Sequence, residues 1–162
     1  MRDRRFVAMH RGGPLDRNSH TFLARWAADC AERVLHLFTR CSEDIRPRRA
    51  LEIARAWANG KVKTGAAMKA SLAAHAAARQ ARDKAAIAAA RAAGHAVATA
   101  HCADHSMGAL LYALKALEAS GCASESELEL QLAKLPDALR EPISSGVNIR
   151  LKKLGIRGLG DQ

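Results

Sequence analysis

The stretch from Gly65 to His105 limits the fold of this chain more than any other part, because about half of its residues are alanine. Alanine has the highest intrinsic helix propensity, and inside the tract Gly94 is the residue that weakens it. Helices with such small side chains can approach toward the short end of the usual range of about 8–10 Å. The tract therefore predicts closely packed helices whose few long polar side chains define the surface between them.

Length and composition indicate one helical domain. The chain has 162 residues, of which 49% are hydrophobic and only 4% aromatic. Each buried methyl group contributes about 0.8 kcal/mol or less, so we expect a core of many shallow contacts rather than a few large anchors. We predict an all-α, compact single-domain bundle of about five to seven helices with alanine-rich central helices. We also expect a partner protein or a second copy of the chain, in a homo-oligomer, to cover part of its surface.

Apolar periodicity and capping residues predict the course of the helices. Asp83 and Thr64 are candidate caps, and Ser124 with Glu127 has the spacing of a capping box. The segment 104–106 either breaks or bends the chain. The predicted helices span residues 19–39, 47–59, 65–82, 84–103, 107–120 and 125–135.

The two ends of the chain differ from the helical middle. Residues 1–18 are polar and turn-rich and predict an arm laid over the body, and residues 19–140 form the helical domain. Residues 141–162 form a basic tail that packs on the domain or extends from it. Within it, Val147, Ile149 and Leu151 alternate as in a short strand, although an isolated strand is rarely stable. Glycines near the end, at 155, 158 and 160, suggest a loose segment.

The chain is strongly basic, with a formal net charge of +10. Basic residues gather at both ends, and if those ends converge they would attract acidic partners, including nucleic acid. The scarcity of aromatic residues argues against a dedicated single-strand binder. The residues concerned are Arg2, Arg4, Arg5, Arg11, Arg17, Arg150, Lys152, Lys153 and Arg157.

Cysteine spacing and the amino terminus indicate a cytoplasmic protein. The four cysteines, at 30, 41, 102 and 122, form no CxxC pair, and the first residues contain no apolar signal-peptide core. No run of about 18 apolar residues could cross a membrane. We expect four free thiols, with Cys30 and Cys102 buried as small hydrophobes.

Histidines near the end of the alanine tract are the candidate metal ligands. His101 and His105 are four residues apart, so an unbroken helix would place both on one face, with His95, His75 or Cys102 as a further ligand. No HExxH motif is present. We favour structural or partner-contacting histidines over a metal site, and expect no cofactor.

A polar seam is predicted between the third and fourth helices. Their short link favours antiparallel packing, which brings His75 and Arg79 opposite Arg91 and His95, with His101 beyond. Such a seam suits carboxylate binding, because arginine offers a bidentate fork. As an internal hydrogen-bond network it would instead fix helix register, and this second interpretation is the one we favour.

The two tryptophans are the largest anchors available. Trp26 lies in the middle of the apolar stripe of the first helix and is expected in the core. Trp57, beside Arg55, is either a core residue or an interface anchor. The sequence contains no phosphate-binding loop, nucleophile elbow or recognisable acid–base pair of carboxylates, so nothing in it indicates an enzyme.

Four segments together carry a resemblance to a known family. The pattern begins with Gly12-Gly13-Pro14-Leu15. The segments after it are HTFLARWAADCAERVLHLF (20–38), RPRRALEIARAWANG (46–60), SLAAHAAARQA (71–81) and AAARAAGHAVATAH (88–101). Over about residues 10–118 this pattern resembles the immunity-5-like family of bacterial immunity proteins, helical domains associated with polymorphic toxin systems. The resemblance implies a cytoplasmic protein that neutralises a toxin by binding it, without catalysis. The family pattern includes Trp26, Asp29, Cys30, Arg55, Trp57, His75, Arg79, Arg91, His95 and His101.

The leading hypothesis is a non-enzymatic immunity protein that contacts its toxin through the seam and the first two helices. The residues of this predicted surface are His75, Arg79, Arg91, His95, His101, Arg55 and Trp57. An inhibitor of a cationic nuclease site is expected to be acidic, so either the toxin surface is acidic or the charge lies away from the interface. The alternatives are a basic helical protein that associates with nucleic acid, and a metal-dependent hydrolase using the histidines of the fourth and fifth helices.

Overall fold

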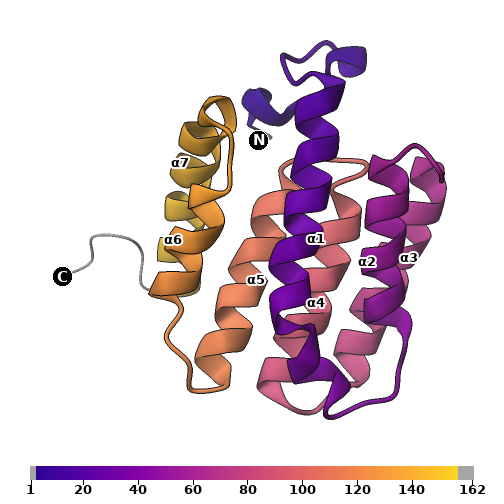
Figure 1. Cartoon of the computed structure of the whole chain (residues 1–162). Helices are drawn as coiled ribbons and strands as arrows, with labels where there is room; N and C mark the ends of the chain where they lie inside the picture. Colours follow the sequence, from indigo (N-terminus) through magenta and orange to yellow (C-terminus); the bar gives the residue numbers. More distant parts are fainter. Residues whose placement is uncertain (1–2, 157–162) are drawn as a thin grey trace.

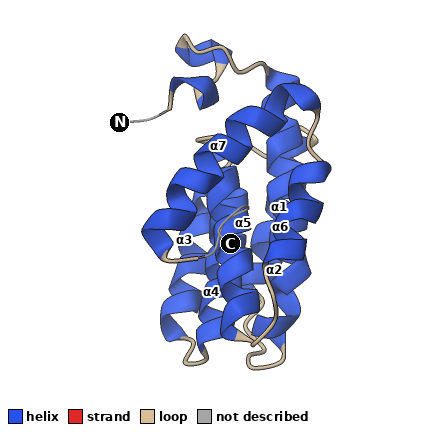
Figure 2. Cartoon of the chain, turned by 90° about the vertical axis from the view of Figure 1, so that its left-hand side faces the viewer, coloured by secondary structure: helices blue, strands red, loops and turns tan. Residues whose placement is uncertain are grey.

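The computed structural model describes residues 3–156, and within this range the chain is all-α (Figures 1 and 2). Two short 3₁₀ helices, Arg4–Phe6 and Met9–Arg11, and one isolated bridge between Ala8 and Leu15 precede the bundle. The predicted fold class is confirmed. The seven α-helices are α1 Arg17–Thr39, α2 Arg46–Ala58, α3 Thr64–Gln80, α4 Lys84–Ala98, α5 His105–Ala119, α6 Glu125–Ala133 and α7 Asp137–Leu154.

Helix α4 is the centre of the bundle. It contacts α1, α2, α3 and α5, and most of its residues are buried alanines. Helices α1 and α2 lie in front of α3, α4 and α5, while α6 and α7 pack at the side of α5 (Figure 1). Because α4 is enclosed on nearly all sides, the bundle needs methyl-sized side chains there, which explains the alanine tract.

The core consists of two clusters of different character. The first joins α1–α5 and is mainly alanine, as the composition predicts. The second lies between α1, α5, α6 and α7 and contains large side chains such as Leu110, Leu114 and Ile143. Trp26 is buried here and donates its indole N–H to the carbonyl of Gln131 over 2.9 Å, which confirms it as a core residue. The expectation of uniformly shallow contacts holds for the first cluster only.

Of the three predicted caps, Asp83 and Ser124 occupy N-cap positions, Thr64 does not, and only Asp83 makes a capping hydrogen bond. Asp83 caps α4, since its carboxylate accepts from the N–H of Ala86 over 2.8 Å. The hydroxyl of Thr64 instead accepts from the indole of Trp57, because Thr64 is already the first residue of α3. Ser124 has helical backbone angles, so its hydroxyl turns to Glu118 and caps nothing.

The helix is interrupted between α4 and α5. Helix α4 ends at Ala98, a turn spans residues 99–104, and α5 begins at His105. The carbonyl of Thr99 bonds to the imidazole of His20, buried on α1, with Nε2 and oxygen 2.7 Å apart. A carbonyl used in this way leaves the helical ladder, so a tertiary contact from α1 stabilises the break.

Residues 147–151, expected to alternate as a strand, belong to helix α7. Buried positions on α7 are Leu139, Ile143, Gly146, Val147 and Leu151, which is helical spacing. Ile149 is 56% exposed. The alternation was misleading because packing against α5 and α6, and not the local pattern, determines the secondary structure of this segment. The helix also contains Pro142.

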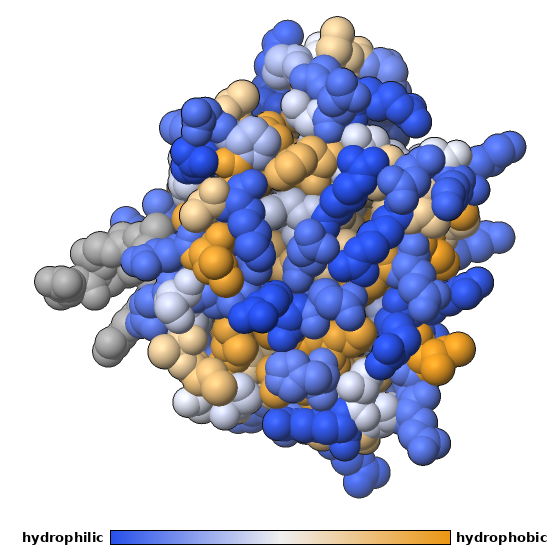
Figure 3. All heavy atoms as spheres, viewed as in Figure 1, coloured by the Kyte–Doolittle hydropathy of each residue, from blue (hydrophilic) through white to orange (hydrophobic). Residues whose placement is uncertain are grey.

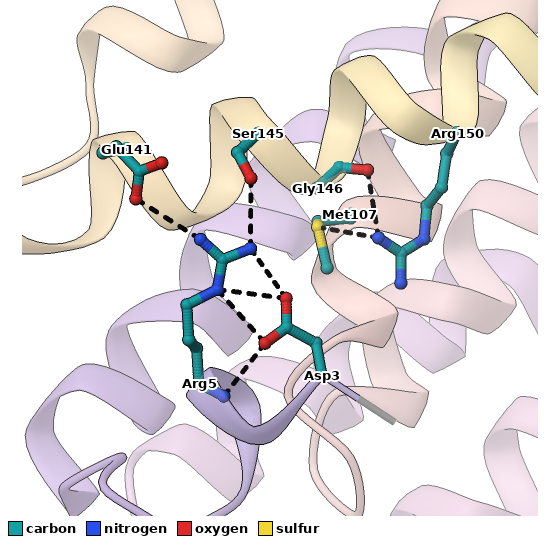
Figure 4. A network of polar contacts seen from close by, with 7 residues as sticks. All are labelled: Asp3, Arg5, Met107, Glu141, Ser145, Gly146 and Arg150. Carbon is teal, nitrogen blue, oxygen red and sulfur yellow. Dashed lines mark hydrogen bonds and ion pairs between the residues drawn. The ribbon is translucent and has the colours of Figure 1, made fainter. Parts of the chain in front are cut away.

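The amino-terminal arm lies against α7 (Figure 4). The Arg5 guanidinium pairs with Asp3 at 2.7 Å and Glu141 at 3.3 Å, and donates to the hydroxyl of Ser145. Phe6 is buried in the second core cluster. The two basic ends therefore meet, but Arg5 is neutralised by carboxylates. Arg2, Arg157, Gly158 and Gly160 lie outside the described residues.

The cysteines and the helix lengths agree with two further expectations. Cys30 and Cys102 are buried, while Cys41 and Cys122 are exposed, and none of the four is in a disulfide. Burial raises the pKa of the Cys30 thiol well above its ordinary value. Among residues 3–156, no helix is long and apolar enough to cross a membrane.

Candidate functional site: a histidine row across three helices

Helix α4 reaches the surface of the bundle along a single stripe. Apart from Lys84 at its start, its residues that are not fully buried are Ile87, Arg91 and His95. These three are each four residues apart, so they lie on one side of the helix. The stripe runs between α3 and α5, on the side of α4 away from α1 and α2.

Four imidazoles form a continuous row at this stripe, which we call the histidine row. The ring of His75, from α3, meets that of His95 edge-on with 5.2 Å between centroids. His95 lies 5.3 Å from His105 at the start of α5, and His105 lies 5.0 Å from His101 in the preceding turn. The Nδ1 atoms of His95 and His105 are 3.2 Å apart, so one ring donates its N–H to the other.

Two helical glycines make room for the row. A Cβ atom built on Gly94 of α4 would lie 2.7 Å from Nε2 of His75, and one on Gly108 of α5 would lie 2.6 Å from Nδ1 of His95. Each imidazole thus rests on the bare backbone of the neighbouring helix. Glycine weakens a helix by about 1 kcal/mol relative to alanine. At both positions this cost is offset by the space that the glycine leaves for an imidazole ring of the neighbouring helix.

Tyr112 and Arg91 extend the row on α5 and α4. The Tyr112 ring stacks on His95 with centroids 5.1 Å apart and planes 14° from parallel. The Arg91 guanidinium lies 5.8 Å from the centre of the Tyr112 ring, within the range of a cation–π contact. Stacking therefore holds Arg91 at the surface without a carboxylate.

Burial and neighbouring positive charge keep His75 and His95 of the row neutral. Burial lowers the pKa of His95 to about 4; positive charge at His105, His75 and Arg91 acts in the same direction, and the carboxylate of Asp104 opposes it. Burial also lowers the pKa of His75, together with the charges of Arg91 and Arg79. Neutral imidazoles can donate and accept hydrogen bonds without the cost of burying charge.

The remaining predicted site residues fall into two groups. Arg79 is exposed one turn beyond His75 on α3. Arg55 is away from the row and joins α2 to α1, pairing with Asp29 at 2.9 Å and Glu32 at 3.1 Å. The structure thus brings together the seam residues of α3 and α4, whereas Arg55 belongs to the contact between α1 and α2. Figure 3 shows the face of the molecule on which α1 and α2 lie, where hydrophilic residues predominate.

Trp57 lines a cavity of about 410 Å³. The cavity lies between the amino-terminal arm, the end of α2 and the 99–104 turn, and His101 reaches it from the end of the histidine row. Trp57 is half-buried, and its ring lies 4.9 Å from that of His20. It is therefore neither fully in the core nor an exposed anchor.

The geometry does not favour a metal centre. The prediction of two ligands on one helix required an unbroken turn through His101 and His105, and α4 ends at Ala98. Within residues 3–156, no group of three or more histidine, cysteine, aspartate or glutamate side chains could hold a metal ion. The three histidines named for such a site, His95, His101 and His105, belong to the row instead.

Comparison with known proteins identifies the family to which the chain belongs. The family model described as "Imm-5 like putative immunity protein" matches residues 13–138. The chain belongs to this family. The searches of curated proteins and of solved structures returned no significant match.

The match to the Imm-5-like family covers α1 to α6 and the first residues of α7, so it includes the whole histidine row. The amino-terminal 3₁₀ helices and most of α7 lie outside it. The row therefore lies within the region that the family model matches. The arm and α7 pack against the second core cluster of the bundle.

The surface around the row extends beyond the residues named from sequence, and we call it the histidine face. It contains the unburied residues of three helices that flank the row. The spacing of residues 68, 72, 75 and 79 could have indicated the α3 contribution, whereas Tyr112 required the register of α4 against α5. The histidine face consists of Met68, Leu72, His75, Arg79, Ile87, Arg91, His95, His105, Tyr112 and Lys115.

Proposed function

We propose that this protein is an immunity protein that neutralises a bacterial toxin by binding it directly, without catalysis. The observation that carries the proposal is the match of the Imm-5-like family over residues 13–138. Binding is also consistent with the character of the histidine face, where Arg91 is held over Tyr112 beside half-buried neutral imidazoles. Such preorganised side chains lose little conformational freedom when a partner docks.

The direct test is protection against the toxin domain encoded beside this protein's gene. Each adjacent candidate is expressed in a bacterial host with and without this protein. We expect one candidate to kill only in its absence, and the two chains to copurify as a complex of fixed stoichiometry. Failure to protect against every adjacent candidate would contradict the proposal.

A second measurement separates binding from catalysis. The toxin is released from the complex by denaturant, refolded alone and examined by mass spectrometry. We expect its mass to be unchanged and its activity to return, because binding modifies no bond. A permanent mass change, produced by far less than one equivalent of this protein, would instead show that it acts as an enzyme.

A further inference from the structure

The arginines of this protein divide into two groups. The arginines that form ion pairs within residues 3–156 all lie outside α3, α4 and α5. The paired arginines are Arg5, Arg33, Arg46, Arg49, Arg55 and Arg140. The positive charge of the arm, α1, α2 and α7 is therefore partly compensated, and that of the three central helices is not.

The acidic residues explain this division. Between residues 64 and 119 the sequence contains only Asp83, Asp104 and Glu118. All three are engaged: Asp83 caps α4, Asp104 accepts from the Cys102 thiol and Glu118 accepts from Ser124. The residues of the histidine face include Arg79, Arg91 and Lys115 but no aspartate or glutamate, although Asp104 lies near enough to His95 to act on its pKa.

The same face also exposes apolar side chains. Leu72 is 71% exposed and Met68, one turn earlier on α3, is 47% exposed. They adjoin His75 at helical spacing, and Tyr112 lies across the row. Methionine, tyrosine and arginine are enriched in protein–protein interfaces, with charge at the rim and apolar contacts at the centre.

We propose that the histidine face is the toxin-binding surface and that the toxin presents to it an acidic surface with an apolar centre. This inference rests on the proposed function. Carboxylates of the toxin would pair with Arg79 and Arg91, and an apolar side chain would cover Leu72. An acidic toxin surface accounts for the strongly basic charge of this member of the family.

The apolar pair distinguishes a protein partner from nucleic acid. Leu72 and Met68 would gain nothing against a phosphate backbone, whereas a protein surface buries them. Tyr112, which contributes the one phenol ring of the face, is already stacked on His95 and is not free to stack on a base. The observations therefore favour a protein surface.

Charge reversal with a matched control tests the electrostatic half of the proposal. The variant Arg79→Glu with Arg91→Glu is compared with Arg40→Glu with Arg48→Glu. Arg40 and Arg48 are exposed, lie outside the face and form no ion pair with any residue of the described range 3–156. Both variants change the net charge equally. Against the purified toxin domain, we expect the first to weaken binding roughly a hundredfold and the control less than about threefold. Equal losses in both would overturn the proposal.

Two exposed apolar residues test the other half. Leu72→Ala is compared with Ile45→Ala, because Ile45 is 70% exposed and lies before α2, outside the face. We expect roughly a tenfold loss of affinity for Leu72→Ala alone. Both side chains lie in solvent, and circular dichroism checks that each variant is folded. Unchanged affinity for Leu72→Ala would overturn an apolar centre on this face.

The outcomes separate this proposal from the proposed function. Protection by the wild type together with full protection by both face variants would overturn the surface and leave the immunity function standing. No protection by the wild type would end both. Tight binding of a 30-base-pair duplex that the charge reversal abolishes, or a dimer that Leu72→Ala dissociates, would assign the face to nucleic acid or to a second copy of the chain.

Discussion

The imidazole of His75 occupies the space that a side chain on Gly94 would need. A Cβ atom there would lie 2.7 Å from Nε2 of His75, closer than real contacts allow. If the ring moved away, it would lose its edge-on contact with His95. This relationship fixes α3 against α4 and ties the position of the histidine row to the backbone of α4.

The contact between His75 and Gly94 predicts that Gly94→Ala lowers the free energy of unfolding in the wild type and raises it when His75 is replaced by alanine. In the wild type we expect the free energy of unfolding to fall by about 1–2 kcal/mol, because the ring is displaced. In a His75→Ala background the same change should raise it by about 0.5–1 kcal/mol, since alanine is the better helix former. Urea denaturation of the four proteins in the cycle measures both. Destabilisation of equal size in both backgrounds would show that His75 does not occupy this space.

The lowered pKa of His95 predicts a loss of stability in mild acid. The folded pKa of His95 is about 4, against an ordinary 6.5 in the unfolded chain. Below pH 6.5 the unfolded state therefore binds a proton that the folded state excludes, so stability is full above this pH and is lost as the pH falls toward 4. Between pH 7.5 and 5.5 the loss due to His95 should be about 1.4 kcal/mol.

A variant isolates this effect from other titrating groups. His95→Gln removes the titration of this residue, so its stability should fall less over the same interval. The lowered pKa values of His75 and His20 act in the same direction and remain in the variant. Identical pH profiles for the two proteins, from urea denaturation, would contradict a neutral, buried His95.

Helix α7 predicts unequal effects for two neighbouring aliphatic residues. Leu151 is 1% exposed in the second core cluster, whereas Ile149 is 56% exposed. We expect Leu151→Ala to cost about 2–5 kcal/mol of unfolding free energy and Ile149→Ala less than about 0.5 kcal/mol. Thermal denaturation compares the two. Equal costs would favour the alternating arrangement and contradict the helix.

The thiols should react in two classes. Cys41 and Cys122 are exposed, while Cys30 and Cys102 are buried. A thiol reagent reacts with the thiolate, and burial both hides Cys30 and raises its pKa. In the native protein we expect fast reaction of Cys41 and Cys122 and reaction of the other two only after denaturant is added. Fast labelling of Cys30, located by peptide mass spectrometry, would contradict the packing of α1.

Local signals predicted most of the fold. The alanine tract, the apolar stripe of α1 and the cap at Asp83 act within a few residues, so the sequence shows them directly. The break after Ala98 depends on His20, which lies 79 residues away from Thr99 along the chain. Such tertiary contacts carry no local pattern, and the same is true of α7.

The candidate site was predictable to the same extent. A short link between α3 and α4 places His75 opposite His95, so that contact follows from sequence. Tyr112 and Gly108 enter only through the register of α5 against α4, which depends on the turn between them. Arg55, expected on the part of the contact surface formed by the first two helices, lies away from the row, and its carboxylate partners are on α1.

A methyl- and imidazole-resolved NMR titration with the toxin domain locates the binding surface most directly. We expect resonances of Leu72, Met68 and the His75 ring to shift on binding, while those of Ile45 and Ile149, which are equally accessible on other faces, stay in place. Shifts at Ile45 and the residues of α2, with Leu72 and His75 unchanged, would show that the toxin binds elsewhere.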